Sequence, residues 1–425
     1  LLRAALAAAE PAAAARAHPD RDPTLAATIR ATAGRVFVVG AGKAGAPMTA
    51  ALVERFPDAI AGGLVVLPRG HADRPAIGPV RLVEAAHPLP DEAGAAAAAE
   101  LLALAEKTGE HDLLVCLLSG GASALLPAPT PPLTLADLRA ATDLLLRSRA
   151  PIGDINAVRR HLSRVQGGRL AAASRAPVVT LVLSDVAGDP LHDIGSGPTA
   201  PDPTTFADAR AALVRHGLWP AVPDAVRLHL EAGLAGHVPE TIKPGDPRLA
   251  RAACRVVASG RHAALAAAAA ARAAGLAADV LATRVEGEAR EFGRLLAALA
   301  RGLHSGDAGR PRPACWVLSG ETTVALGPAA GRGGRNQEAA LAAAIALAGC
   351  PDVLVACLGT DGTDGNTDAA GAIVDGDTLA RAGGRDPHAA LAAHDSHPLL
   401  AAAGALLRTG PTLTNVGDLA LVLAF

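Results

Sequence analysis

The sequence predicts an α/β protein of two lobes, and three observations lead to this. At 425 residues the chain exceeds the usual size of one domain. Half of the residues are hydrophobic but only 2% are aromatic, so aliphatic packing of helices on sheets must fill the core. Short apolar runs that end in glycine-rich loops alternate with alanine-rich helical segments. Proline and glycine replace apolar periodicity at 220–247, which places a boundary near residue 240 and predicts domains 1–240 and 241–425.

Charge and composition exclude several classes of partner. The formal net charge of −2 provides no field that would gather nucleic acid, and the scarcity of aromatic residues removes stacking platforms for single strands. No apolar run reaches the length of a membrane span, and Glu10 and Pro11 interrupt a segment that resembles a signal peptide. The five cysteines form no CxxC pair and are typical of buried, reduced thiols. We expect a cytoplasmic protein that binds small molecules, not nucleic acid or membranes.

In the first lobe, apolar runs predict buried strands and amphipathic periodicity predicts helices. The expected strands are 35–39, 64–67, 81–84, 113–118 and 178–183, and the expected helices include 47–55 and 133–147.

The second lobe shows the same alternation, with strands that predict a mixed sheet flanked by two alanine-rich helices. The expected strands are 255–258, 280–283, 315–318, 323–326, 353–358 and 419–423, and the helices are 261–275 and 336–349.

A glycine loop, GAGKAG at 40–45, follows the first strand and opens a helix. It has the GxGxxG form, but a dinucleotide fold also needs an acidic residue closing the second strand, and that strand ends in Pro68-Arg69-Gly70. Lys43 is one of three lysines against 36 arginines, which hints at a compact cation acting as a phosphate clamp beside Gly42. The alternative is an exposed lysine with no role.

Two further segments of the first lobe suggest an anion site. The loop that follows strand 113–118 contains Ser119, Gly120, Gly121 and Ser123, whose backbone N–H groups and hydroxyls can point at one ligand. Segment 156–169 is unusually basic, and Arg160, Arg164 and Arg169 can converge on a carboxylate or phosphate if its first part is helical. A tight βα turn and a solvated helix face are the respective alternatives.

Acidic and basic residues also stand at the ends of predicted strands. Asp185 follows strand 178–183, a placement that catalysis often uses and that also suits a helix N-cap. Glu321 follows a strand in the loop SGETT, and Gly334, Arg335 and Asn336 open a helix where backbone donors and a guanidinium can hold phosphate oxygens together.

The loop GTDGTDGNTD at 359–368 brings three carboxylates close together after a buried strand. Asp361 and Asp364 are candidate ligands for a cation, because water, a metal ion or basic side chains must offset their repulsion. An EF-hand is excluded, because its obligatory glycine position holds Ala369. A solvated turn is the remaining alternative.

Taken together, eight motifs in this order resemble the glycerate 2-kinase family, the MOFRL-type glycerate kinases, over nearly the whole chain. The motifs are GAGKAG at 40–45, LSGGASAL at 118–125, NAVRRHLS at 156–163, SDVAGD at 184–189, GSGPT at 195–199, GGRNQE at 333–338, GTDGTDG at 359–365 and TGPT at 409–412.

This resemblance implies a Rossmann-like N-terminal lobe, with a parallel sheet and helices on both faces, and a distinct α/β C-terminal lobe with the active site in the cleft between them. It implies transfer of the γ-phosphoryl of ATP to the C2 hydroxyl of D-glycerate, with Mg²⁺. Lys43 and Arg335 would provide positive charge around the transferred phosphoryl group, and Asp185 would act as a base or as a metal ligand.

The remaining candidates follow from the same resemblance. Asp361 and Asp364 would hold the metal, and Arg160 and the Ser119 loop would bind the glycerate carboxylate and hydroxyls. Gly42, Glu321, Gly334 and Asn336 would contact substrate or nucleotide.

The chain departs from the family pattern at two places: only Gly320 precedes Glu321 where two glycines are expected, and Leu413 follows TGPT where glycine is usual. An NAD-dependent hydroxypyruvate reductase and a non-catalytic hydroxy-acid binding protein remain alternatives. The oligomeric state is open, with a homodimer as one candidate.

Overall fold

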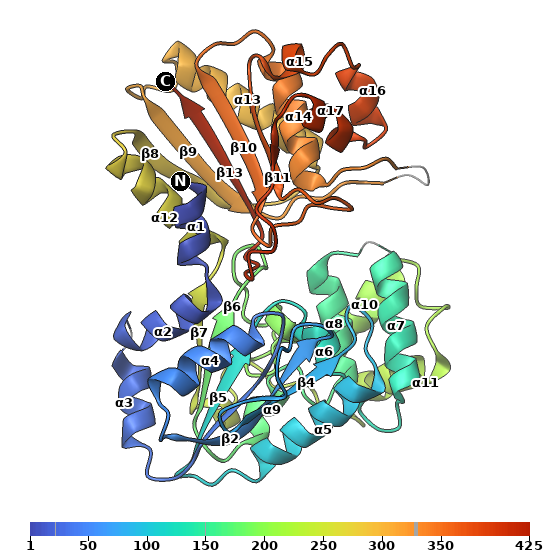
Figure 1. Cartoon of the computed structure of the whole chain (residues 1–425). Helices are drawn as coiled ribbons and strands as arrows, with labels where there is room; N and C mark the ends of the chain where they lie inside the picture. Colours follow the sequence, from blue (N-terminus) through green and yellow to red (C-terminus); the bar gives the residue numbers. More distant parts are fainter. Residues whose placement is uncertain (22, 149, 327–329) are drawn as a thin grey trace. The chain divides into compact units, whose positions relative to one another are not determined.

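The computed structural model describes residues 1–21, 23–148, 150–326 and 330–425, and it divides into two compact units (Figure 1). The larger unit contains Pro11–Leu183 and Asp189–Val257. The smaller unit contains Leu1–Glu10, Ser184–Gly188 and Ala258–Phe425. Among the described residues, no helix is long and apolar enough to cross a membrane.

The larger unit is built on a seven-stranded sheet in the order β3-β4-β2-β1-β5-β6-β7. Strand β1 pairs in parallel with both β2 and β5, and β2/β4 and β5/β6 are also parallel, whereas β3 is antiparallel to β4. The strands are β1 (Val36–Ala41), β2 (Ile60–Pro68), β3 (Ala76–Ile77), β4 (Val80–Ala85), β5 (Leu113–Leu118), β6 (Val178–Leu183) and β7 (Ala252–Ala258). A mostly parallel sheet is confirmed.

Helices pack on this sheet and on one another. A separate apolar cluster joins α7, α8, α10 and α11 and includes Leu145, Val158, Phe206 and Leu230. Capping boxes begin α7 at Thr134 and α10 at Thr205, which satisfies the first backbone donors of both helices. The helices of this unit are α2 (Pro11–Arg21), α3 (Pro23–Ala31), α4 (Gly45–Arg55), α5 (Glu92–Glu106), α6 (Ala122–Leu125), α7 (Leu135–Arg147), α8 (Ile152–Leu162), α9 (Arg169–Ala173), α10 (Phe206–Arg215) and α11 (Asp224–Leu234).

The smaller unit has a mixed six-stranded sheet in the order β12-β11-β10-β13-β9-β8. Only β8 and β9 pair in parallel among its described ladders, since β13 runs antiparallel to both β9 and β10. The strands are β8 (Ala277–Val285), β9 (Ala314–Gly320), β10 (Val353–Gly359), β11 (Gly371–Asp375), β12 (Leu406–Leu407) and β13 (Asp418–Ala424). The predicted mixed sheet is therefore confirmed.

Two helices cover one face of the smaller sheet. Helices α13 (Ala289–Ser305) and α14 (Arg335–Leu347) contact each other and form one buried cluster with β10, β11 and β13. Helix α12 (Gly260–Ala273) contacts β8, β9 and the short α1 (Leu2–Ala8). The remaining helices are α15 (Thr378–Arg381), α16 (Pro387–Ala392) and α17 (Ser396–Ala402).

The division into units differs from the predicted boundary near residue 240. Strand β7, which we expected to open the second sheet, lies at the edge of the first, and residues 241–257 belong to the larger unit. Ile242 already exchanges backbone hydrogen bonds there, with Gly167 and Asp202. The proline-rich composition of residues 220–247 correctly indicates a loop, but β7, the strand that follows this loop, still belongs to the first sheet.

Two other expectations differ from the structure. Residues 323–326 form no strand; they are mostly exposed and contribute one isolated bridge, between Thr323 and Glu288. Strands β3, β11 and β12 were not predicted, because β3 and β12 have only two residues each and β11 begins within the alanine- and glycine-rich run 369–372, which does not favour a strand.

Candidate functional site

The glycine loop after β1 uses its own backbone donors inside the protein. Gly42 N donates to Val66 O, Lys43 N to Gly120 O and Ala44 N to Ser119 Oγ, each at 3.0 Å. Gly45 N donates to Gly42 O. A dinucleotide loop must offer such amides to a pyrophosphate, so this loop does not provide that cradle.

The Lys43 ammonium makes no hydrogen bond or ion pair with any residue that the structure describes. It nevertheless acts on His87: burial first, and then the charges of Lys43 and Arg159, lower the pKa of His87. A cation with no carboxylate partner at the end of a parallel strand is suited to an anionic ligand.

The loop after β5 lies directly beside Lys43. Gly121 has a left-handed backbone with φ of 91° and would place a Cβ only 3.1 Å from the His87 ring, so glycine is required here. Ser119 is committed to Ala44, and Ser123 Oγ lies 2.8 Å from Ser196 Oγ. Within the described chain, no residue accepts a hydrogen bond from the amides of Gly120, Gly121 or Ser123. They remain available for a ligand.

Arg160 differs from its predicted role. Its side chain is 1% exposed and forms ion pairs of 2.9 Å with Asp193 and Asp202. It also donates to the backbone oxygen of His192 and to Thr204. Because these buried partners occupy the guanidinium, Arg160 holds loops together and is not placed to bind a substrate carboxylate.

In the smaller unit, Arg335 lies at the start of α14 between two carboxylates. Its Nε is 2.7 Å from Asp418 Oδ2, and its Nη1 donates to Glu321 at 2.8 Å. Burial by itself would lower the pKa of Arg335. The negative charges of Asp418 and Glu321 have the larger effect, so the pKa of Arg335 is raised. Burial raises the pKa of both Asp418 and Glu321, against the effect of Arg335. The Glu321 side chain is 45% exposed, so Asp418 is the stronger partner.

Asp364 caps α14 instead of facing solvent. Its Oδ1 accepts from Asn336 N and Nδ2, and its Oδ2 accepts from Gln337 N and Nε2, at 2.8–3.2 Å. Gly334 allows this approach, because a Cβ there would lie 2.3 Å from Asp364 Cγ. All these lone pairs are used, and Asn336 also donates to Asp418. We therefore correct the predicted metal role of Asp364 and the ligand role of Asn336: both complete the helix start.

Asp361 and Asp185 have more open surroundings. Asp361 Oδ1 accepts from Thr363 N at 3.0 Å, and the residue is half-buried. Asp185 accepts from Asn415 at 3.3 Å, and its charge contributes to the raised pKa of Glu321. The structure thus groups Asp185 with Arg335 and Glu321 in the smaller unit, whereas we had placed it in the first lobe.

A pocket of about 670 Å³ lies in the smaller unit beside the start of α14. This volume is in the range of small-molecule sites. Its lining combines a glycine-rich backbone, apolar side chains and charged groups; it includes Val324, Leu326, Gly331, Gly333, Gly334, Arg335, Glu338, Asp361, Asn366 and His394.

Several residues of this site were not predicted from the sequence. His394 Nδ1 lies 2.8 Å from Glu338, which is buried and paired with Arg290 at 3.0 Å. Asp418 pairs with Arg335. The sequence indicates Asp418 only through its position, as the carboxylate that begins the apolar strand β13. Arg159 and His87 lie by the larger unit's free amides, and no spacing rule distinguishes Arg159 from Arg160.

Leu413, the residue that departs from the family pattern, is 76% exposed and has φ of 63°. A left-handed conformation is costly for leucine and free of strain for glycine. We predict that Leu413→Gly stabilises the protein by about 1 kcal/mol in urea unfolding. Leu228→Gly is the control, because Leu228 is similarly exposed at 71% but lies inside α11, where glycine should destabilise. A loss of stability in Leu413→Gly would contradict the strain argument.

Comparisons with known proteins agree with this architecture. A family model described as a domain of unknown function, DUF4147, matches residues 1–231, and the MOFRL family model matches residues 314–418. A glycerate 2-kinase of Pyrococcus horikoshii is 40% identical over 92% of this chain and 87% of its own length. An Agrobacterium vitis protein named provisionally as a hydroxypyruvate reductase is 47% identical over the same shares of the two chains.

A solved structure matches throughout. The crystal structure of a glycerate kinase from Thermotoga maritima superposes with a TM-score of 0.87 and 37% identity, covering 100% of this chain and 97% of that one. Both units are thus shared with a glycerate kinase of known structure. The chain belongs to the glycerate 2-kinase family.

Proposed function

We propose that this protein is an ATP-dependent glycerate 2-kinase, which transfers the γ-phosphoryl group of ATP to the C2 hydroxyl of D-glycerate. The family membership supports this proposal, and so does one observation in the fold. The backbone amides of residues 42–45 are all occupied inside the protein, so the GxGxxG loop is unsuited to the nicotinamide dinucleotide that a hydroxypyruvate reductase needs.

The site residues divide into two sets with complementary chemistry. In the larger unit, Lys43 and the free amides near Ser123 provide positive charge for anionic groups. In the smaller unit, the pocket beside Gly334 and Arg335 has the size for a nucleotide, and its glycines allow close approach of phosphates. Glu321 positions Arg335. Asp185 is our candidate for the base that takes the proton of the C2 hydroxyl.

The residues present fit a magnesium ion held mainly by substrate. Mg²⁺ keeps several waters and is usually bound through one or two carboxylates plus phosphates, and it neutralises the charge that develops on those phosphates. Asp361 offers a half-buried carboxylate at the pocket, whose Oδ1 accepts a hydrogen bond from Thr363 N. Within the described chain, no three acidic, histidine or cysteine side chains are arranged so that they could hold a metal ion together.

A pair of assays tests the proposal directly. With D-glycerate, ATP and Mg²⁺, we expect ADP release and a product that ³¹P NMR identifies as the 2-phosphate. With hydroxypyruvate and NADH or NADPH, we expect no oxidation of the nucleotide. Oxidation without ADP release would establish the reductase instead, and binding of glycerate without either reaction would indicate a binding protein. The cytoplasmic location and a homodimer stay predictions.

The two aspartates of the 359–368 loop should behave differently when replaced. Asp361→Asn is expected to raise the Mg²⁺ concentration for half-maximal activity by about tenfold, because an amide is a weaker ligand for a hard cation. Asp364→Asn should leave that concentration unchanged and cost about 2 kcal/mol of stability, because its new NH₂ group faces the donors of α14. Magnesium titrations and urea unfolding of both variants measure this. The reverse pattern would return Asp364 to the metal site.

A further inference from the structure

Two adjacent arginines on α8 have opposite surroundings. Successive residues on a helix point about 100° apart, so Arg159 and Arg160 cannot share one environment. Arg160 is fully buried among Asp193, Asp202 and Thr204. Arg159 is partly exposed, and its guanidinium makes no hydrogen bond or ion pair with any residue in the described part of the chain. Of these two arginines, Arg159 is therefore the one that is available to a ligand.

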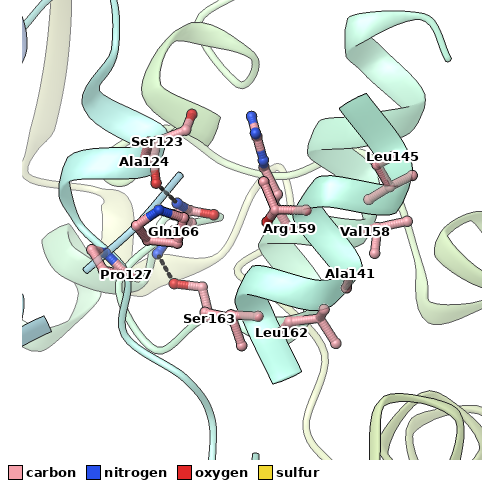
Figure 2. A pocket seen from close by; sticks show the side chains of 13 residues that line it. Ser123, Ala124, Pro127, Ala141, Leu145, Val158, Arg159, Leu162, Ser163 and Gln166 are labelled. Atoms are coloured by element: carbon pink, nitrogen blue, oxygen red, sulfur yellow. Dashed lines mark hydrogen bonds between the residues drawn. The ribbon is translucent and has the colours of Figure 1, made fainter. Parts of the chain in front are cut away.

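Arg159 extends from an apolar floor toward a polar end. Figure 2 shows its guanidinium on the same side of the pocket as the Ser123 hydroxyl and away from Leu162 and Ala141. Burial without a compensating carboxylate lowers the pKa of Arg159 to about 10. A guanidinium in such a place still carries its charge at neutral pH and favours an anion beside it.

Arg159 and Lys43 act on the same neighbourhood. After burial, their charges are the next causes that lower the pKa of His87, with a smaller contribution from His71. The His87 ring lies against Gly121, whose amide, like those of Gly120 and Ser123, lacks an acceptor in the residues described. Two cations thus lie near a loop that offers three free backbone donors and contains no carboxylate.

The loop is held firmly enough to position a ligand. Gln166 Nε2 donates to Ser123 O at 3.1 Å, as Figure 2 shows. The Ser123 hydroxyl is hydrogen-bonded to the Ser196 hydroxyl, which donates to Asn156 Oδ1. The cavity beside Arg159 measures about 20 Å³, which is room for one water-sized group and not for a nucleobase. A carboxylate matches the planar fork of the guanidinium.

We propose that Arg159 binds the carboxylate of the hydroxy-acid substrate, together with the free amides of the loop 120–123. Arg159 takes the place that the sequence suggested for Arg160. The assignment rests on the proposed kinase function, which supplies the substrate class, and it separates the acceptor's carboxylate in the larger unit from the nucleotide pocket in the smaller one.

Steady-state kinetics of Arg159→Ala, Arg159→Lys and the exposed control Arg164→Ala test the proposal. We expect Arg159→Ala to raise the KM for D-glycerate by about 30- to 100-fold, with kcat within about threefold and the KM for ATP within about twofold. Arg159→Lys should recover part of the loss. With the neutral amide of D-glycerate, the parent and Arg159→Ala should differ by less than about threefold, because no carboxylate is present.

Three results would overturn the assignment. A raised KM for ATP with an unchanged KM for D-glycerate would make Arg159 a phosphate ligand. Equal losses with glycerate and its amide would indicate a purely structural residue. If Arg159→Ala had the same kinetics as Arg164→Ala, Arg159 would have no role in binding the substrate. If the parent does not phosphorylate glycerate at all, the proposed function fails separately; calorimetric binding of D-glycerate, present in the parent and lost in Arg159→Ala, would still support the carboxylate site, and no binding to the parent would refute it.

Discussion

Lys43→Ala is expected to lower kcat by a factor of about 100 to 1,000 while the fold stays intact. Losing one charge contact to the transition state commonly costs about 3–4 kcal/mol. The Lys43 ammonium has no partner among the described residues, so its removal leaves no buried carboxylate unpaired and no hydrogen bond broken. Lys107→Ala is the control, because Lys107 is exposed at the end of α5. Initial rates at saturating ATP and D-glycerate measure the effect, and activity within threefold of the parent would show that Lys43 has no catalytic role.

Arg335→Ala should cost stability as well as activity, because it leaves Asp418 buried without its cation. Breaking a fully buried pair costs about 3–5 kcal/mol, and since Arg335 is 33% exposed we expect about 2–3 kcal/mol. Arg332→Ala is the control in the same glycine loop, because its side chain is exposed. Urea unfolding at pH 7.5 measures the loss, and kinetics under conditions where the variant is folded measure the activity.

The loss in Arg335→Ala should depend on pH with a definite sign. Burial already raises the pKa of Asp418, and without Arg335 that pKa rises further. A carboxyl whose pKa is raised by folding binds more protons in the folded state, so its contribution to stability falls as pH rises through the folded pKa. The stability gap between parent and variant should therefore narrow from pH 7.5 to pH 5. A gap that widens toward acid pH would mean that Asp418 is not the group left unpaired.

The strands that the sequence predicts most accurately are continuous apolar runs ended by small polar residues. The predicted 113–118 and 178–183 coincide with β5 and β6, because each run is buried on both faces and stops at Ser119 or Ser184. Residues 323–326 carry a similar β-favouring composition but have no neighbouring strand, and pairing decides whether such a run becomes a strand.

Side-chain roles were harder to predict than elements, for two physical reasons. Arg159 and Arg160 differ only by the rotation of α8, and the packing of that helix against Asp202 decides which one is buried. Asp364 lies in a loop whose composition favours a cation, yet its partner is the start of α14, about 30 residues earlier in the chain. In both cases the deciding contact is distant in sequence, so no local pattern contains it.

The backbone passes between the two units four times, after Glu10, Leu183, Gly188 and Val257. The smaller unit is therefore not one continuous gene segment. A fragment 258–425 would lack α1, which packs on α12, and the Ser184–Gly188 turn, in which Asp185 bonds Asn415. Recombination at a single junction near residue 258 would transfer the smaller unit without α1 and the Ser184–Gly188 turn. To exchange the whole unit between homologues, residues 1–10, 184–188 and 258–425 must be inherited together.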